Sequence, residues 1–109
     1  SASKADFTNA SGIKANLSYI NLNGATLVNT SLTSAKLDSS YLFQANLTGA
    51  NLSSITAMYS NMTSANLTNA NLTNSTIDYA FMLGAITTGS VQTGTIFTGT
   101  QMPNGTIQK

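Results

Sequence analysis

The sequence contains no cysteine and no histidine among its 109 residues. Without cysteine, the chain can form neither a disulfide nor a thiolate metal site, and its redox compartment stays undetermined. Without histidine, it lacks the side chain that most often serves as a general base or as a metal ligand. We therefore expect neither a cofactor nor a metal, and the usual catalytic arrangements are excluded.

Charge is also scarce, because only 6% of the residues are charged and the formal net charge is +1. The charged side chains are Lys4, Lys14, Lys36, Lys109, Asp6, Asp38 and Asp78. A protein that binds nucleic acid through the phosphate backbone needs a basic stripe, and four scattered lysines do not make one. We expect no nucleic-acid partner.

The chain has no apolar run of the roughly 18 residues that a transmembrane helix requires, so no membrane span is predicted. The opening Ser1–Lys4 has no apolar core and is not itself a signal peptide, although it could be what remains after cleavage of one. Hydrophobic residues make up 41% and most others are Ser, Thr, Asn or Gly. Such polarity is compatible with disorder, but the apolar residues are placed too regularly for that.

The dominant feature is a period of five residues. Every fifth position from Phe7 to Met82 is large and apolar in fourteen of sixteen cases, and we call this the centre position. The fourteen residues are Phe7, Leu17, Leu22, Leu27, Leu32, Leu37, Leu42, Leu47, Leu52, Met62, Leu67, Leu72, Ile77 and Met82. We predict that they form the core.

The other positions of the period are regular too. The position two residues before each centre favours a small residue: it is Ala in ten of sixteen cases and large in only two, Ile20 and Ile55. Asn is favoured between this position and the centre, and Thr or Ser follows the centre. A period of five makes neither one face of a helix nor one face of a continuous strand. It fits short extended segments, each with two inward positions, separated by bends.

Stretches such as Ala45–Gly49 and Ala65–Asn69 resemble the pentapeptide-repeat family, whose motif is Ala, Asp or Asn, Leu or Phe, Ser or Thr, and any residue. The resemblance implies an all-β fold, a right-handed quadrilateral parallel β-helix with four repeats in each coil of about 20 residues. We expect four to five coils: an N-terminal tail at 1–4, the solenoid at 5–84, and an irregular last coil with a C-terminal cap at 85–109.

Gly12 and Ala57 occupy centres that require a large residue, and each is followed by an apolar one, Ile13 or Met58. A local bulge could bring the following residue inward. Otherwise the interior is underfilled at these two points.

The pattern also changes after Met82, because the next centres are Thr87 and Gln92. One residue earlier, an apolar row recurs every five residues: Phe81, Ile86, Val91 and Ile96. Either the frame slips by one residue near 83, which we favour, or this row faces outward. Pro103 should stop the ladder, and Asn104–Gly105 is typical of a turn.

Coils of twenty residues place outward residues in columns, and these columns bring the aromatic side chains to one side. The predicted set is Tyr19, Tyr41, Phe43, Tyr59, Tyr79, Phe81 and Leu83. Clustered surface aromatics indicate an interface. They are equally compatible with a ladder that stabilises neighbouring coils, or with a patch that the chain's own tail covers.

No catalytic constellation emerges. Asp38 and Asp78 share a column but lie two coils, or about 10 Å, apart. That separation would suit an inverting glycosidase, but nothing implies a cleft, and solvated surface carboxylates are the simpler interpretation. We predict that the chain is not an enzyme.

Three functions remain open. The first is a non-enzymatic structural or interaction module that binds a protein partner, or itself as a homodimer, through the aromatic face. The second is binding of ice, mineral or glycan through the Thr and Asn ladders, although the family prefers Ser or Thr there in any case. The third, a gyrase-protecting DNA mimic, is known in the family but requires an acidic surface that this chain lacks. The segment 97–106 resembles the closing segment of cyanobacterial members; the compartment is undetermined, with a preference for an exported location in periplasm, thylakoid lumen or extracellular space.

Overall fold

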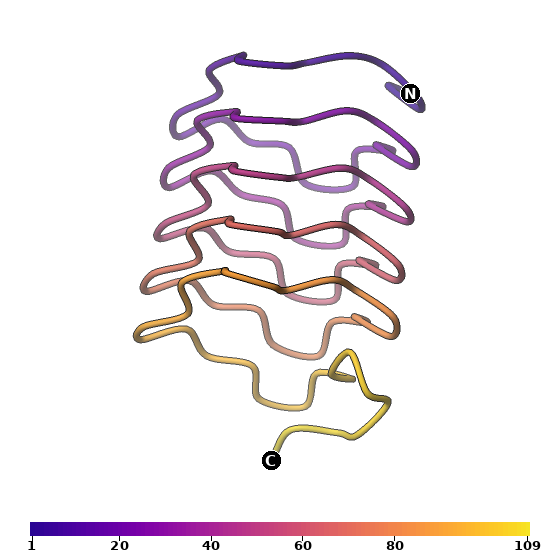
Figure 1. Cartoon of the computed structure of the whole chain (residues 1–109), viewed down its shortest axis with the longest axis vertical. Helices are drawn as coiled ribbons and strands as arrows, with labels where there is room; N and C mark the ends of the chain where they lie inside the picture. The colour runs from indigo at the N-terminus through magenta and orange to yellow at the C-terminus, as the bar shows by residue number, and fades with distance from the viewer.

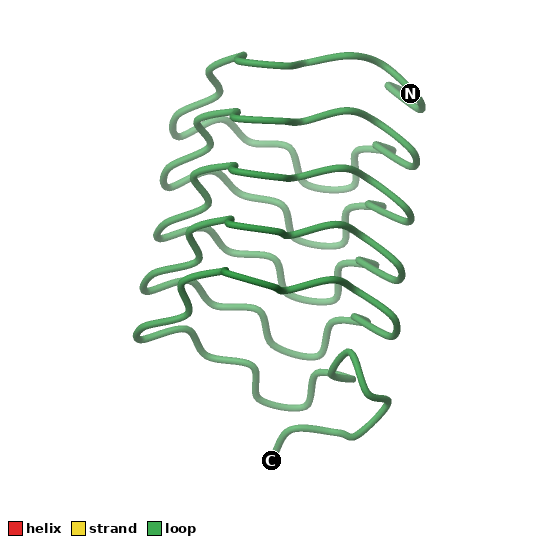
Figure 2. Ribbon diagram, viewed as in Figure 1, coloured by secondary structure: helices red, strands yellow, loops and turns green.

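The chain winds into a stack of similar coils, with its two ends at opposite ends of the stack (Figure 1). The computed structural model describes all 109 residues and measures 33 × 24 × 23 Å. It contains no helix and no continuous strand, so the whole chain is drawn as loop in Figure 2. Its β-structure consists of isolated bridges between successive coils.

Each five-residue repeat is built around one turn. For example, the N–H of Ala50 donates to the carbonyl of Leu47 at 3.0 Å, which closes a four-residue turn over Leu47–Ala50. The third residue of every such turn, from Lys4 to Gly99, has a φ between 56° and 72°. A positive φ at that position defines a type II turn. Because a turn recurs every five residues, the chain bends before a strand can lengthen.

The coils stack in a constant register in which each bridging residue pairs in parallel with the residue twenty positions later. Leu47, for example, donates its N–H to the carbonyl of Asn66 at 2.7 Å, and Asn66 donates to Ala45 at 2.9 Å. This register defines coils 1 to 5 as 5–24, 25–44, 45–64, 65–84 and 85–104. The predicted right-handed quadrilateral β-helix is confirmed.

Each coil has four sides, which stack into four faces of the solenoid. We name them by their residues in coil 1, and the later coils follow at intervals of twenty. Face A begins with 5–9, face B with 10–14, face C with 15–19 and face D with 20–24. Faces B and D are opposite each other, as are faces A and C.

The core fills the inside of the tube. Twelve of the fourteen predicted centres are buried, whereas Phe7 and Leu17 in coil 1 are partly buried and pack against the others. From coil 2 onward the alanines two residues before a centre are buried as well, and Ala25, Ala45 and Ala65 are completely inaccessible. Large and small residues thus alternate around a narrow interior.

Gly12 does not form a bulge. Its N–H keeps the regular ladder bond to the carbonyl of Ser31 at 2.8 Å, and Ile13 stays outside with 54% exposure. The side chain of Leu32 leans into the vacant space instead, so that its Cδ2 would lie only 2.9 Å from a Cβ at position 12. The bulge hypothesis is wrong here, because the uninterrupted ladder leaves no place for an extra residue.

Ala57 does not form a bulge either, since its N–H keeps the ladder bond to Thr76 at 2.9 Å. Ile55, two residues earlier, is 1% exposed and occupies a position that is usually small. The sizes of the two inward residues are exchanged, so the missing volume at Ala57 is supplied from the same side of the same coil.

The frame does not slip after Met82, so that preferred prediction is wrong and the alternative is right. The bridges Asn66↔Ile86, Asn71↔Val91 and Thr76↔Ile96 keep the twenty-residue register. The apolar row therefore points outward, with 48%, 48% and 50% exposure for Ile86, Val91 and Ile96. Turns keep the phase at regular five-residue intervals, at Gly84, Gly89, Gly94 and Gly99.

Both ends of the chain extend the ladder. At the N-terminus, Ala2 and Lys4 donate their N–H groups to the carbonyls of Asn21 and Asn23, each at 2.9 Å. At the C-terminus the chain turns back after Pro103, and Ile107 forms an antiparallel bridge with Gln101. The segment 105–109 therefore covers part of the last coil.

Candidate functional site

Face D carries two apolar ridges. In coil 2, Tyr41 and Phe43 point outward with 51% and 39% exposure, and in coil 4 Phe81 and Leu83 do so with 52% and 45%. Each pair flanks an inward centre, so both members stand on the same face of the tube. The sequence predicted this grouping from the twenty-residue columns.

Between the ridges lies a polar valley. Asn61 and Thr63 occupy the corresponding positions of coil 3 and are half-buried. Asn61 Oδ1 accepts the backbone N–H of Thr63 at 3.0 Å, which holds the Asn61 side chain close to the backbone. Coil 1 has a similar valley at Asn21 and Asn23, where Asn23 Oδ1 accepts the N–H of Phe43 at 2.9 Å. Apolar ridges and polar valleys therefore alternate along face D.

The tyrosine column at the corner of faces C and D behaves differently. The Tyr59 and Tyr79 rings stack with centroids 5.4 Å apart and an interplanar angle of 13°. Tyr19 is 77% exposed, and Ser39 separates it from the pair. The self-packed ladder is thus real for Tyr59 and Tyr79. A Cβ at Gly99 would collide with the Tyr79 ring, so the glycine there leaves room for the stack.

The rings of Tyr41 and Phe81 do not belong to such a ladder. They share a column but lie two coils, or about 10 Å, apart, and Asn61 stands between them. Stacked aromatic rings have centroids about 4.5–7 Å apart. These two apolar side chains are therefore free to contact another molecule.

Face D is also free of charge. None of its residues in coils 1 to 5 is Lys, Arg, Asp or Glu. The charged residue nearest to it along the ladder is Lys4, which precedes coil 1. Depletion of charge combined with aromatic side chains is the composition of the centre of a protein interface.

Several hydroxyls in the Asn and Thr rows of faces A and B are hydrogen-bonded within their own repeats. Asn46 Oδ1 accepts the N–H of Thr48 at 3.1 Å and its hydroxyl at 2.6 Å. The same paired bonds join Asn51 to Ser53, Asn66 to Thr68 and Asn71 to Thr73. Each of these hydroxyl protons is thus already donated within its own repeat.

Two of the three carboxylates link neighbouring coils through hydrogen bonds. Asp38 accepts the N–H of Met58 at 2.8 Å and the hydroxyl of Thr56 at 3.1 Å, both from the next coil. Asp78 accepts the N–H of Thr98 at 2.9 Å in the same way. No three His, Cys, Asp or Glu side chains lie together where they could hold a metal ion. The structure offers no helix long and apolar enough to span a bilayer.

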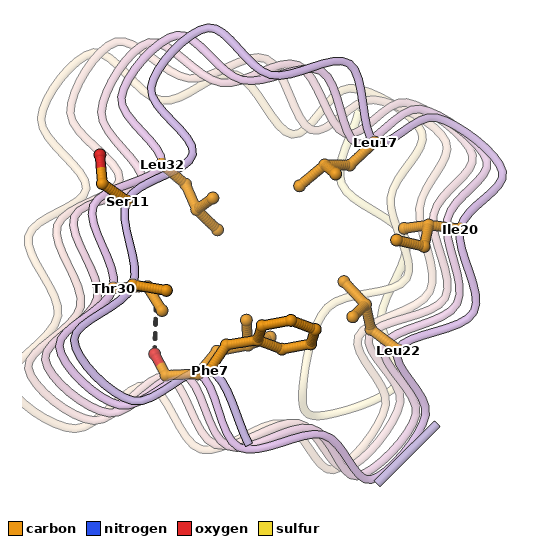
Figure 3. A pocket seen from close by; sticks show the side chains of 9 residues that line it. Phe7, Ser11, Leu17, Ile20, Leu22, Thr30 and Leu32 are labelled. Atoms are coloured by element: carbon orange, nitrogen blue, oxygen red, sulfur yellow. Dashed lines mark hydrogen bonds between the residues drawn. The ribbon is translucent and has the colours of Figure 1, made fainter. Parts of the chain in front are cut away.

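One further feature, which none of the predicted site residues mark, is an apolar hollow of about 210 Å³ at the N-terminal end of the tube (Figure 3). Seen along the axis, Phe7, Leu17, Ile20 and Leu32 point into it from different sides. Thr30 lies at its edge and donates its hydroxyl to the carbonyl of Leu27 at 2.9 Å. The missing side chain at Gly12 was the only signal for this space.

Comparison with known families agrees with this architecture. The profile "Pentapeptide repeats (8 copies)" matches three overlapping segments, 1–27, 15–53 and 35–74, and thus well over half of the chain. The chain belongs to the pentapeptide-repeat family. No curated protein sequence matches it significantly.

Three solved pentapeptide-repeat structures are similar over most of the chain. HetL from the cyanobacterium Nostoc, a protein involved in heterocyst differentiation regulation, is 26% identical over 96% of this chain, with a TM-score of 0.82. Rfr23 from the cyanobacterium Cyanothece is 30% identical over 87%, with a TM-score of 0.81. A protein of the Arabidopsis thaliana thylakoid lumen is 26% identical over 95%, with a TM-score of 0.73. The chain spans 52%, 65% and 69% of these three proteins.

Proposed function

We propose that this chain is a non-enzymatic interaction module that binds a protein surface through face D. The observation that carries this proposal is the pair of exposed apolar ridges, Tyr41 with Phe43 and Phe81 with Leu83, on a face without charge. Exposed aromatic and aliphatic side chains that gather on an uncharged face have the composition of an interaction site. The hydrogen-bonded ladder fixes the backbone beneath these side chains, so binding does not have to order the backbone.

The other functions have less support. The hydroxyls of Thr48, Ser53, Thr68 and Thr73 donate to neighbouring asparagines, which leaves fewer donors for ice, mineral or glycan. Catalysis by a carboxylate would need Asp38 or Asp78 to be available, and both accept backbone N–H groups of the next coil. A DNA mimic would need an acidic surface, and three Asp stand against four Lys.

The test compares two double variants that remove apolar surface of equal kind. Tyr41→Ser with Phe81→Ser removes the ridges of face D, and Ile86→Ser with Val91→Ser removes side chains of similar exposure on faces A and B. Binding is measured by sedimentation, with the chain alone and with proteins recovered from its source. We expect association to be lost only in the first variant. Equal behaviour of the two variants, or a wild type that associates with nothing, would contradict the proposal.

A further inference from the structure

We infer that the partner of face D is a second copy of this chain, packed antiparallel so that the ridges of each copy fill the valleys of the other. The inference rests on the proposed use of face D and adds the identity and register of the partner. The first support is the alternation of exposed and half-buried side chains along face D. Exposed apolar pairs stand on coils 2 and 4, whereas the corresponding pairs of coils 3 and 5, Asn61 with Thr63 and Gln101 with Pro103, are half-buried.

The spacing of the ridges suits interdigitation. Coils stack about 4.8 Å apart, so the ridges lie about 10 Å apart with one valley between them. Where two β-sheets pack face to face, their side chains likewise interdigitate in the space of about 10 Å between the two sheets. A valley one coil wide can therefore receive one ridge of another copy.

Symmetry then selects the orientation. A two-fold axis along the solenoid keeps coils at the same level, so that ridge meets ridge and the valleys stay empty. A two-fold axis along the strand direction reverses the order of the coils and keeps each column opposite itself. Placed between coils 3 and 4, this axis sets the Phe81 and Leu83 ridge on Asn61 and Thr63 of the second copy. The interface is self-complementary and closes as a dimer.

Pro103 favours this register over its neighbour. With the axis between coils 3 and 4, the ridge of coil 2 lies over Gln101 and Pro103, so that Phe43 meets an apolar side chain. With the axis between coils 2 and 3, the coil 4 ridge would lie over Asn21 and Asn23 instead. Covering a proline with an apolar ridge costs less free energy than covering two amides, because the amides lose their hydrogen bonds to water.

The available area is compatible with a weak dimer. An overlap of four coils, about 19 Å at ~4.8 Å per coil, on a face 24 Å wide covers roughly 450 Å² of each copy as flat area. The total of roughly 900 Å² lies at the low end of specific interfaces. The absence of charge on face D removes like-charge repulsion, which would otherwise oppose the contact of two identical faces.

A valley-filling variant tests the register. Thr63→Phe adds an apolar side chain to face D but occupies the valley, whereas Thr33→Phe adds the same side chain to the opposite face B. Sedimentation equilibrium should show that wild type and Thr33→Phe dimerise equally and that Thr63→Phe does so at least tenfold more weakly. Circular dichroism checks that both variants fold. A Thr63→Phe chain that dimerises as well as wild type, or better, overturns the inference.

Distances between spin labels test the orientation, since the chain has no cysteine of its own. Two single variants, Ser39→Cys in coil 2 and Ser64→Cys in coil 3, place a label at the edge of face D. The proposed dimer offsets the two Ser39 labels by three coils, about 14 Å along the axis, and the two Ser64 labels by one coil, about 5 Å. We therefore expect the longer distance for Ser39. Equal distances would show parallel copies or the neighbouring register, and either overturns the inference.

The failure of this inference can be told from that of the proposed function. A chain that stays monomeric, yet binds another protein in a way that Tyr41→Ser with Phe81→Ser abolishes, would refute only the second copy as partner. A chain whose associations ignore that double variant would refute both.

Discussion

Coil 1 and coil 2 share one backbone conformation but differ in how deeply they bury the same residue type. Leu37 in coil 2 is 1% exposed, whereas Leu17, at the same position of coil 1, is only partly buried. Coil 2 has a complete coil on each side, and coil 1 has one on a single side. The difference teaches that in a solenoid the motif sets the direction of a side chain and the neighbouring coils set its burial.

The largest expected effect is at Leu37. Leu37→Ala removes a buried side chain from a filled interior and should lower the free energy of unfolding by about 2–5 kcal/mol. Leu17→Ala should cost less than half as much, because part of that side chain already contacts solvent in the folded state. Urea unfolding of the two variants measures both losses. Equal losses would mean that burial in coil 1 is as complete as in coil 2.

Replacing glycine by alanine should change the stability in opposite directions at Gly12 in coil 1 and at Gly49 in coil 3. Gly12 has no positive φ, and a Cβ there would meet the flexible end of Leu32 at 2.9 Å and the Cβ of Ala15 at an ordinary contact distance of 3.6 Å. Gly12→Ala should therefore stabilise the chain by about 0.5–1 kcal/mol. Gly49 in coil 3 has a φ of 69°, and a Cβ there would collide with Asn29, so Gly49→Ala should destabilise by about 1–2 kcal/mol. Thermal unfolding of both variants checks the two signs, and a loss of stability in Gly12→Ala would mean that Leu32 cannot move back.

The sequence predicted the tube, its centres and the grouping of the aromatic side chains, because all three follow from a period of five and a coil of twenty. It failed at Ile86, Val91 and Ile96, where an apolar row with the same period competed for the interior. Hydrophobicity could not decide between two rows one residue apart. The backbone ladder decides, and the glycines of the turns, which include Gly84 and Gly89, already carried its phase.

The sequence predicted the candidate site about as far as it predicted the fold. The twenty-residue columns placed Tyr41, Phe81, Tyr59 and Tyr79 on one side of the tube. They did not predict which of these rings stack. Stacking depends on whether two rings stand on adjacent coils, and Tyr59 and Tyr79 do so whereas Tyr41 and Phe81 do not. The valley of coil 3 could not be seen either, because the half-buried position of Asn61 depends on the hydrogen bond that its Oδ1 accepts from the backbone N–H of Thr63.

A smaller difference is expected between the tyrosines of coils 1 and 3. Tyr19 and Tyr59 both have a positive φ, 65° and 60°, which is unfavourable for a bulky side chain. Tyr59 regains stability by stacking on Tyr79, whereas Tyr19 is 77% exposed. Tyr19→Asn should therefore raise the free energy of unfolding by about 0.5–1 kcal/mol, and Tyr59→Asn should leave it unchanged or lower it by a similar amount. A gain in both variants would show that the stack contributes nothing.

The smallest effect separates Asp6 in coil 1 from Asn46 in the same column of coil 3. Asp6 Oδ1 accepts the hydroxyl of Thr8 at 2.6 Å and its N–H at 3.0 Å, as Asn46 does from Thr48. The hydrogen bond from the Thr8 hydroxyl, together with that from the Thr8 backbone, lowers the pKa of Asp6 below its ordinary value.

Because the folded state lowers this pKa, its contribution to stability is present above the unfolded pKa and is lost as the pH falls through the folded one. Asn46 does not titrate, so its turn should keep the same strength in acid. Carboxyl chemical shifts followed through an acid titration should show that Thr8→Val raises the pKa of Asp6 toward its ordinary value. The Thr48→Val variant, in which the same hydroxyl is lost from coil 3, should leave that pKa unchanged. A pKa of Asp6 that ignores Thr8→Val would mean that the hydroxyl does not favour the carboxylate, and the turns of coils 1 and 3 would then respond alike to acid.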